Sequence, residues 1–185
     1  MISLSDDKIA VRTPQAGDEA HLVKFSKNNV EHFQPTGLIV LPDDLTIEKW
    51  QKYITTAQQE LENLKAVRFL IFHDENGAVP IGKINYSQIF KGLFQACYLG
   101  YGIDKDFEGK GIMTRALRLT IDYMFNEINL HRIMANYLPD NLASARLLEK
   151  LGFVIEGTAK NYLMINGVWR DHVLTSLTNQ NWVKE

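Results

Sequence analysis

The chain has 185 residues, a formal charge of −2 at pH 7 and an isoelectric point near 6.2. This length fits one domain that buries roughly 70% of its unfolded surface, and the near-neutral charge gives no general attraction to nucleic acid. A single cysteine, Cys97, excludes an internal disulfide framework and a cysteine-based metal cluster.

The beginning of the chain is too polar and acidic for a signal peptide, and no apolar run is long enough to span a membrane. We therefore expect a cytoplasmic protein without a membrane partner. The five histidines lack the spacing of paired ligands, so we expect no metal site. Nothing in the sequence indicates an oligomeric state.

The first third of the chain predicts a strand over residues 9–13 and a helix over residues 17–27. Residues 28–37 are turn-prone and mixed in character, which is typical of a loop. A second helix is predicted over residues 47–64, where the apolar side chains fall on one face.

Three strand-like runs follow, over residues 67–72, 79–90 and 94–104, separated by turns that contain glycine. They predict an antiparallel meander. Gly100 and Gly102 lie inside the third run, where they remove packing surface. Such glycines are expected where something approaches the backbone closely, although a bend in the strand is an alternative.

The third strand runs through a glycine loop into a helix predicted over residues 111–127. The first N–H groups of a helix are unpaired and its dipole is positive there, so glycines at this point favour a phosphate site. The spacing excludes two common phosphate loops. A Walker loop would need Ser or Thr where Gly111 stands, and a dinucleotide fingerprint would need a third glycine. A tight turn without a ligand is the alternative.

The last part of the chain predicts a strand over residues 131–138, then a helix that Asn141 caps and Gly152 ends. Asn166-Gly167 separates two further strand-like runs and favours a two-residue hairpin turn.

Three of these stretches resemble the GCN5-related N-acetyltransferases (GNAT), and most closely the RimJ/RimL-type branch, which acetylates N-terminal alanine of ribosomal proteins. Residues 108–113 are similar to the pyrophosphate loop Gln/Arg-x-x-Gly-x-Gly/Ala, with departures at Glu108 and Met113. Residues 141–144 and 151–153 match Asn-x-x-Ser/Ala followed by Leu-Gly-Phe, and residues 156–172 match the hairpin of the branch. Residues 1–66 match only loosely.

The resemblance implies a mixed α+β fold in one GNAT domain over residues 1–185. Its centre would be a mostly antiparallel twisted sheet of about seven strands with about four flanking helices. The sheet would be splayed between its fourth and fifth strands, so that the pantetheine arm of acetyl-CoA adds to a free strand edge.

The resemblance also implies site residues. Acetyl-CoA would be the co-substrate, held by Gly102, Ile103, Glu108, Gly109, Lys110, Gly111, Ile112, Met113, Thr114, Asn141 and Ser144. Arg115 and Arg118 are candidates to reach its phosphates, with solvated arginines as the alternative. Glu31, His32, Phe33 and Tyr162 are the candidates for contact with the acceptor. For the first three, a surface loop with a buried Phe is the alternative.

Acetyl transfer needs a neutral nucleophile, a polarised thioester carbonyl and a proton source for the departing thiolate. An α-amine has a reference pKa of about 7.7–8.0 and lysine of about 10.4, so an N-terminal acceptor needs no strong base. No motif marks a carboxylate as the base. Ser144 is the expected proton source, since Leu148 stands where some relatives carry Tyr, and backbone N–H groups from Tyr101 to Ile103 are expected to hold the thioester oxygen.

The predicted function is direct acetyl transfer, in a ternary complex, to the N-terminal α-amine of alanine on a ribosomal or other protein. One alternative keeps acetyl-CoA and exchanges the acceptor for a small amine, an amino acid or an antibiotic. A second alternative is a non-catalytic acyl-CoA-binding module, which Glu108 and Leu148 leave open.

Overall fold

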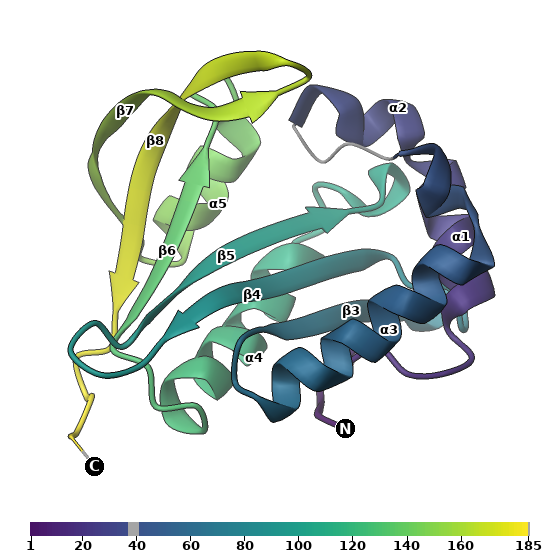
Figure 1. Cartoon of the computed structure of the whole chain (residues 1–185), viewed down its shortest axis with the longest axis horizontal. Coiled ribbons are helices and arrows are strands. Elements are labelled where there is room, and N and C mark those ends of the chain that lie inside the picture. Colours follow the sequence, from purple (N-terminus) through teal and green to yellow (C-terminus); the bar gives the residue numbers. More distant parts are fainter. Residues whose placement is uncertain (37–40, 185) are drawn as a thin grey trace.

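The computed structural model describes residues 1–36 and 41–184, and their centre is one eight-stranded sheet in the order β1-β2-β3-β4-β5-β6-β8-β7 (Figure 1). The strands are β1 (Ser3–Ser5), β2 (Ile9–Arg12), β3 (Val67–His73), β4 (Gly82–Phe90), β5 (Ala96–Ile103), β6 (Arg132–Tyr137), β7 (Val154–Ile165) and β8 (Val168–Thr178). Neighbouring strands are antiparallel except β5 and β6, which are parallel.

The sheet is splayed between β5 and β6. Their pairing runs only from Ala96, opposite Arg132, to Tyr98, opposite Met134, and beyond it the two strands diverge (Figure 1). The splay lies beside the glycine-containing strand, as predicted. The prediction placed the splay after the fourth strand, and the structure places it after the fifth. The difference is β1, because Ser3–Ser5 is too short and polar to be recognised as a strand from the sequence, yet it pairs with β2 and adds one strand to the sheet.

The helices are α1 (Glu19–Asn28), α2 (Val30–Phe33), α3 (Ile47–Glu62), α4 (Ile112–Asn126) and α5 (Leu142–Lys150). In Figure 1, α1 and α3 cover the near face of the sheet, whereas α4 and α5 lie behind it. None of the helices within residues 1–36 and 41–184 has both the length and the apolar character needed to cross a membrane.

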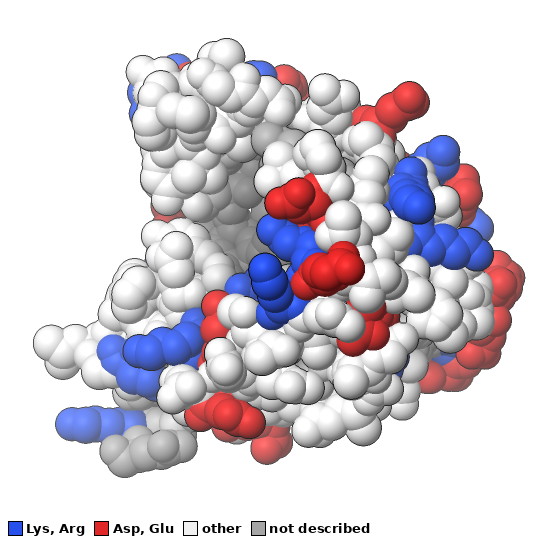
Figure 2. Space-filling view, turned by 45° about the vertical axis from the view of Figure 1, so that its right-hand side comes forward, with Lys and Arg blue, Asp and Glu red and all other residues white. Residues whose placement is uncertain are grey.

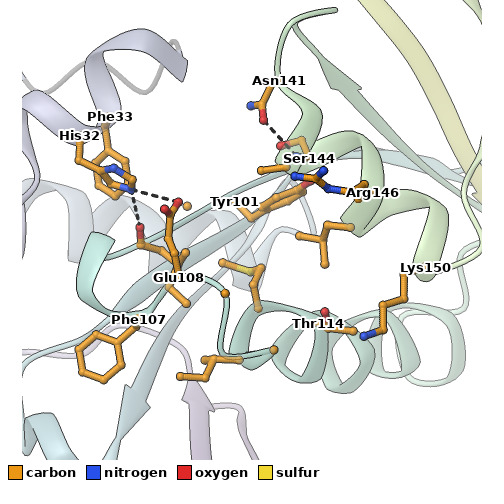
Figure 3. Close-up of a pocket in the computed structure, with 18 residues that line it drawn as sticks. His32, Phe33, Tyr101, Phe107, Glu108, Thr114, Asn141, Ser144, Arg146 and Lys150 are labelled. Atoms are coloured by element: carbon orange, nitrogen blue, oxygen red, sulfur yellow. Dashed lines mark hydrogen bonds and ion pairs between the residues drawn. The ribbon is translucent and has the colours of Figure 1, made fainter.

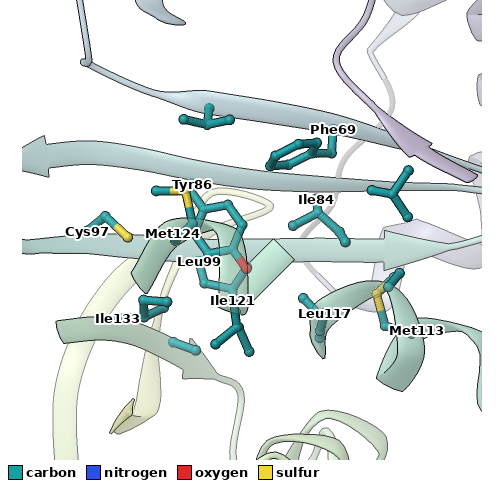
Figure 4. Close-up of a cluster of buried hydrophobic side chains, with 14 of the residues drawn as sticks. Phe69, Ile84, Tyr86, Cys97, Leu99, Met113, Leu117, Ile121, Met124 and Ile133 are labelled. Carbon is teal, nitrogen blue, oxygen red and sulfur yellow. The ribbon is translucent and has the colours of Figure 1, made fainter. Parts of the chain in front are cut away.

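Each face of the sheet has its own core. On the α4 side, the apolar stripe of that helix packs on the strands, and Met113, Leu117 and Met124 share one buried cluster with Tyr86 and Ile133 (Figure 4). On the other face, a smaller cluster joins α1 and α3 to β3 through Leu22, Trp50, Ile54, Leu70 and Phe72. The sheet is therefore fixed on both sides up to the point where it splays.

The predicted loop at residues 28–37 is partly helical, which corrects the sequence-based expectation. Helix α2 is followed by a 3-10 turn at Gln34–Thr36, and Gly37 lies outside the described residues. Asn29 is fully buried between α1 and α2, where its amide donates to Phe25 O at 2.9 Å and to Asp104 Oδ2 at 2.7 Å. The bond between Asn29 and Asp104 joins residues far apart in the chain, so no local sequence pattern predicts it. Such contacts stabilise a short helix in a segment whose composition favours a turn.

The C-terminal hairpin follows the prediction. Asn166 and Gly167 both have positive φ, at 51° and 76°, as the favoured two-residue hairpin turn requires. The side-chain amide of Asn166 donates to Gln34 O at 3.4 Å. The tip of the β7–β8 hairpin thus reaches across to the segment after α2.

Candidate active site

A cavity of about 560 Å³ lies beside the part of β5 that β6 leaves unpaired. Its walls come from the end of β5, the loop and first turn of α4, one side of α5, and α2. Figure 2 shows the surface hollowed between two parts of the molecule, with basic and acidic side chains mixed along the near rim. The cavity is therefore open to solvent and is not rimmed by one sign of charge.

The free edge of β5 exposes backbone groups to this cavity. Asp104 N donates to Ile81 O at 2.7 Å, and the register places Ile103 opposite Gly82. Because bonded and non-bonded pairs alternate along an antiparallel ladder, the N–H and C=O groups of Tyr101 and Ile103 point away from β4. They face the split, where an extended arm with amide groups can pair with them.

The glycine loop presents an open helix start. Gly111 is the N-cap of α4, with φ at +74°, and Gly109 has φ at +70°. Apart from the glycine itself and its two neighbours in the chain, no atom of the described residues would lie within 4 Å of a Cβ added at either position. The helix start therefore faces open space, and its N–H groups fit an anionic group such as a diphosphate.

Glu108 turns its carboxylate toward α2. Its Oε1 lies 3.4 Å from Nε2 of His32, and the same nitrogen lies 3.2 Å from Ile103 O (Figure 3). The side chains of His32 and Glu108 are 21% and 53% exposed. The imidazole of His32 thus holds the carboxylate of Glu108 on the α2 side of the cavity.

Helix α5 supplies the opposite wall. Asn141 caps it by accepting the N–H of Ser144 at 3.0 Å, so the predicted N-cap is present. Ala143, Leu147 and Lys150 follow at helical spacing and line the cavity with Arg146. Arg146 and Lys150 bring two positive charges to the side that faces the glycine loop (Figure 3).

The phenol of Tyr101 is a buried polar group inside this wall. Its hydroxyl has no hydrogen-bond partner among the described residues. Burial raises the pKa of Tyr101 to about 12, and the neighbouring Ser144 hydroxyl offsets only part of that rise. Tyr101 therefore stays protonated at neutral pH and keeps a proton available for a group bound beside it.

The cavity brings most of the sequence-predicted residues together. Those that line it are Tyr101, Gly102, Ile103, Glu108, Gly109, Gly111, Ile112, Met113, Thr114, Asn141 and Ser144, with His32 and Phe33. Sequence analysis did not predict five further residues that line the cavity, which are Phe107, Ala143, Arg146, Leu147 and Lys150. Arg146 and Lys150 carried a usable signal, because two basic residues four apart on a helix share one face.

Other predicted residues lie elsewhere. Lys110 places its ammonium 4.9 Å from the centre of the Phe107 ring, and Glu31 is exposed on α2. Tyr162, on β7, accepts a hydrogen bond from the Asn136 amide at 3.3 Å. Arg115 forms ion pairs with Asp6 and Asp7, so its guanidinium is directed to the N-terminal strand pair and not to the cavity.

No group of three or more His, Cys, Asp or Glu side chains within residues 1–36 and 41–184 is arranged to hold a metal ion. The groups that converge on the cavity are instead amides, hydroxyls and basic side chains. They suit an anionic cofactor with an extended arm, and the unpartnered Tyr101 hydroxyl and the open glycine loop are the features that such a cofactor would satisfy.

A splayed sheet whose free strand edge leads to a glycine-lined helix start defines the acyltransferases that lay a thioester cofactor along that edge. Residues 8–154 match the family model described as Acetyltransferase (GNAT) domain, and the chain belongs to this family. The predicted family, fold class and enzyme class are confirmed, and the protein is an N-acetyltransferase.

Individual relatives match over nearly the whole chain. The [Ribosomal protein uS5]-alanine N-acetyltransferase of Escherichia coli (strain K12) is 38% identical over 181 residues, which are 98% of this chain and 93% of that protein. The ribosomal-protein-S5-alanine acetyltransferase of Vibrio fischeri is 38% identical, with a TM-score of 0.94 and full coverage of both chains. RimJ of Mycobacterium smegmatis, solved in complex with CoA-disulfide, is 25% identical, with a TM-score of 0.87 over 100% of this chain and 89% of that one.

Proposed function

We propose that the protein transfers the acetyl group of acetyl-CoA to the N-terminal α-amine of an alanine on a ribosomal protein. The observation that carries the acceptor is the 38% identity with the E. coli uS5-alanine enzyme over 98% of this chain. That match spans the residues of both walls of the cavity as well as the glycine loop.

The geometry supports acetyl-CoA as the donor. The N–H groups of the glycine loop would hold its diphosphate, and Arg146 and Lys150 would meet its phosphates. The backbone groups of Tyr101 and Ile103 would pair with its arm along the free edge of β5. The RimJ structure with CoA-disulfide supports the same assignment.

The chemistry is a direct transfer. The bound cofactor supplies an activated acyl group on a thiolate leaving group. A backbone N–H of β5 would polarise the thioester carbonyl, and the Tyr101–Ser144 wall would give a proton to the departing sulfur. Cys97 is fully buried in the core, and burial raises the pKa of its thiol to about 12, so it does not serve as an acetyl carrier.

Calorimetry and an acceptor panel test the proposal. Acetyl-CoA should bind the purified protein, and mass spectrometry should find acetylation of peptides and of intact ribosomal protein uS5 that begin with Ala. A matched peptide with a blocked N-terminus should remain unchanged, since the α-amine is the nucleophile. Peptides that begin with Ser or Met test how narrow the acceptor site is.

Two results would contradict the proposal. Turnover of polyamines or amino acids without turnover of peptides would assign a small-molecule acceptor instead. Acetyl-CoA binding without turnover of any amine in the panel would leave a non-catalytic binding module, and the acceptor assignment would then fail.

A further inference from the structure

His32 stands where the acceptor side of the cavity meets the free edge of β5. It lies on α2, a helix joined to the loop after β5 by Asn29, and its ring lines the cavity. Its Nε2 approaches two oxygen acceptors, Ile103 O at 3.2 Å and Glu108 Oε1 at 3.4 Å (Figure 3). The imidazole is thus held by one backbone carbonyl and one carboxylate.

These two contacts set the state of the ring. Carbonyl and carboxylate oxygens only accept hydrogen bonds, so Nε2 carries the proton that both of them share. In the neutral imidazole, Nδ1 is then the nitrogen with the free lone pair. A carboxylate on one ring nitrogen that leaves the other nitrogen basic is the arrangement in which histidine accepts protons from nucleophiles.

The position of the ring suits the transfer. Tyr101 and Ile103 are two residues apart on β5, which corresponds to about 6.6 Å along the strand. Both direct their backbone N–H groups into the split, where the thioester oxygen would be held. The imidazole of His32 enters the cavity from α2, whereas Tyr101 and Ser144 enter it from β5 and α5 (Figure 3).

We propose that His32 accepts the proton that the attacking amine loses, and that Glu108 is the positioning residue that orients His32. A bond forms between the amine nitrogen and the thioester carbonyl carbon, and the carbon–sulfur bond breaks with its electron pair on sulfur. The amine proton goes to Nδ1 of His32, and the sulfur takes a proton from the Tyr101–Ser144 wall. The products are an amide and a thiol, and solvent restores both protein groups.

Acidic side chains gather on the His32 side of the cavity. Glu108 faces the ring from the loop, and Glu31 precedes it on α2. Asp104, at the end of β5, is buried and bound to Asn29. Arg146 and Lys150, the positive groups on the cavity, belong to the opposite wall (Figure 3). The role of Glu108 in orienting His32 also explains why an acidic residue stands at position 108, in the loop that we propose binds phosphate.

The inference rests on the proposed function, and substitution of His32 with chemical rescue tests it. His32→Ala should lower kcat by roughly 10²-fold or more, the usual contribution of a positioned proton acceptor, while calorimetry finds unchanged affinity for acetyl-CoA. Added imidazole should restore a large part of kcat to His32→Ala. Glu108→Gln should lower kcat less, and imidazole should not rescue it, because its ring is still present.

His21→Ala is the matched control, since His21 lies on α1 and does not line the cavity; it should retain wild-type kcat. Wild-type kcat in His32→Ala would overturn the proposal. A loss of kcat in His32→Ala that imidazole cannot restore would also overturn it. A gain in acetyl-CoA affinity without a loss of kcat would overturn it as well, because the ring would then only obstruct cofactor binding. The kcat of each variant is measured with the amine that the wild-type protein acetylates best in the acceptor panel. If that amine is not a peptide, the proposed function is wrong, but the role of His32 can still be tested.

Discussion

Tyr101 has a buried hydroxyl without a hydrogen-bond partner among the described residues, and such a group destabilises a fold by about 1–3 kcal/mol. The same hydroxyl belongs to the wall that we propose as the proton source. Tyr101→Phe should therefore lower kcat while the free energy of unfolding stays the same or rises by about 1 kcal/mol. Initial rates and urea denaturation measure the two quantities.

Tyr123→Phe, on α4, is the control for Tyr101→Phe and should change neither rate nor affinity. Ser144→Ala should lower kcat with little change in acetyl-CoA affinity, because its backbone N–H, which Asn141 accepts, is retained. If Tyr101→Phe keeps full activity and only Ser144→Ala loses it, the proton comes from the serine alone.

Cys97 gives a second prediction at the residue scale. Its thiol is fully buried and its pKa is raised to about 12, so it is neither accessible nor ionised at pH 8. A thiol reagent such as Ellman's reagent should react with it only after the protein is unfolded. Rapid labelling of the native protein would contradict the burial and would reopen the case for an acetyl-cysteine intermediate.

Site residues that depend on local backbone geometry could be predicted from the sequence, whereas those that depend on long-range contacts could not. The glycine loop, Asn141 and Ser144 lie at helix starts, and residue types and spacing encode that local backbone geometry directly. The contact between His32 and Glu108 joins residues far apart in the chain, and neither side chain indicates the other. Arg146 and Lys150 share a face of a predicted helix, but which face turns to the cavity depends on packing.

Gly111 carries the main prediction at the scale of an element, the start of α4. Its φ of +74° is unfavourable for any other residue, so Gly111→Ala should cost about 1–2 kcal/mol of stability. The added methyl group would also enter the open space in front of the helix start, and acetyl-CoA affinity should fall. Thermal denaturation and calorimetry separate the two effects.

Gly92→Ala controls for the strain at Gly111. Gly92 also has φ at +74° and open space around its Cβ position, but it lies in the turn between β4 and β5, away from the cavity. Both variants should lose similar stability, and only Gly111→Ala should lose affinity. Equal affinities in the two variants would remove the glycine loop from cofactor binding.

Elements were predictable where the hydrophobic period was long. The meander, the helix after the glycine loop and the Asn166-Gly167 hairpin follow from their patterns, and the structure contains them. Strand β1 and helix α2 are short, with three and four residues, and tertiary contacts define them. Elements this short contain no complete hydrophobic repeat, and their tertiary contacts determine their structure. Local sequence patterns therefore do not predict them.

At the scale of the whole molecule, the cavity depends on how the N-terminal segment is fixed to the centre of the sheet. Asn29 makes this connection, since it bonds Asp104 through Nδ2 and accepts the N–H of Lys105 at 3.2 Å. These bonds place α2 against the loop that leads to the glycine turn. The arrangement was not predictable, because the resemblance over residues 1–66 was loose and the partners lie outside any local window.

Asn29→Ala therefore tests the assembly of the site. The substitution leaves the buried Asp104 carboxylate without its amide partner, which should cost about 3 kcal/mol of stability and loosen the position of His32. We expect a lower melting temperature, together with a fall in kcat that exceeds any loss of acetyl-CoA affinity, because α2 carries His32, the proton acceptor that we propose. Asn28→Ala, at an exposed position one residue earlier, should change neither quantity. A destabilised Asn29→Ala protein with wild-type kcat at low temperature would show that α2 does not need this connection to hold the acceptor side in place.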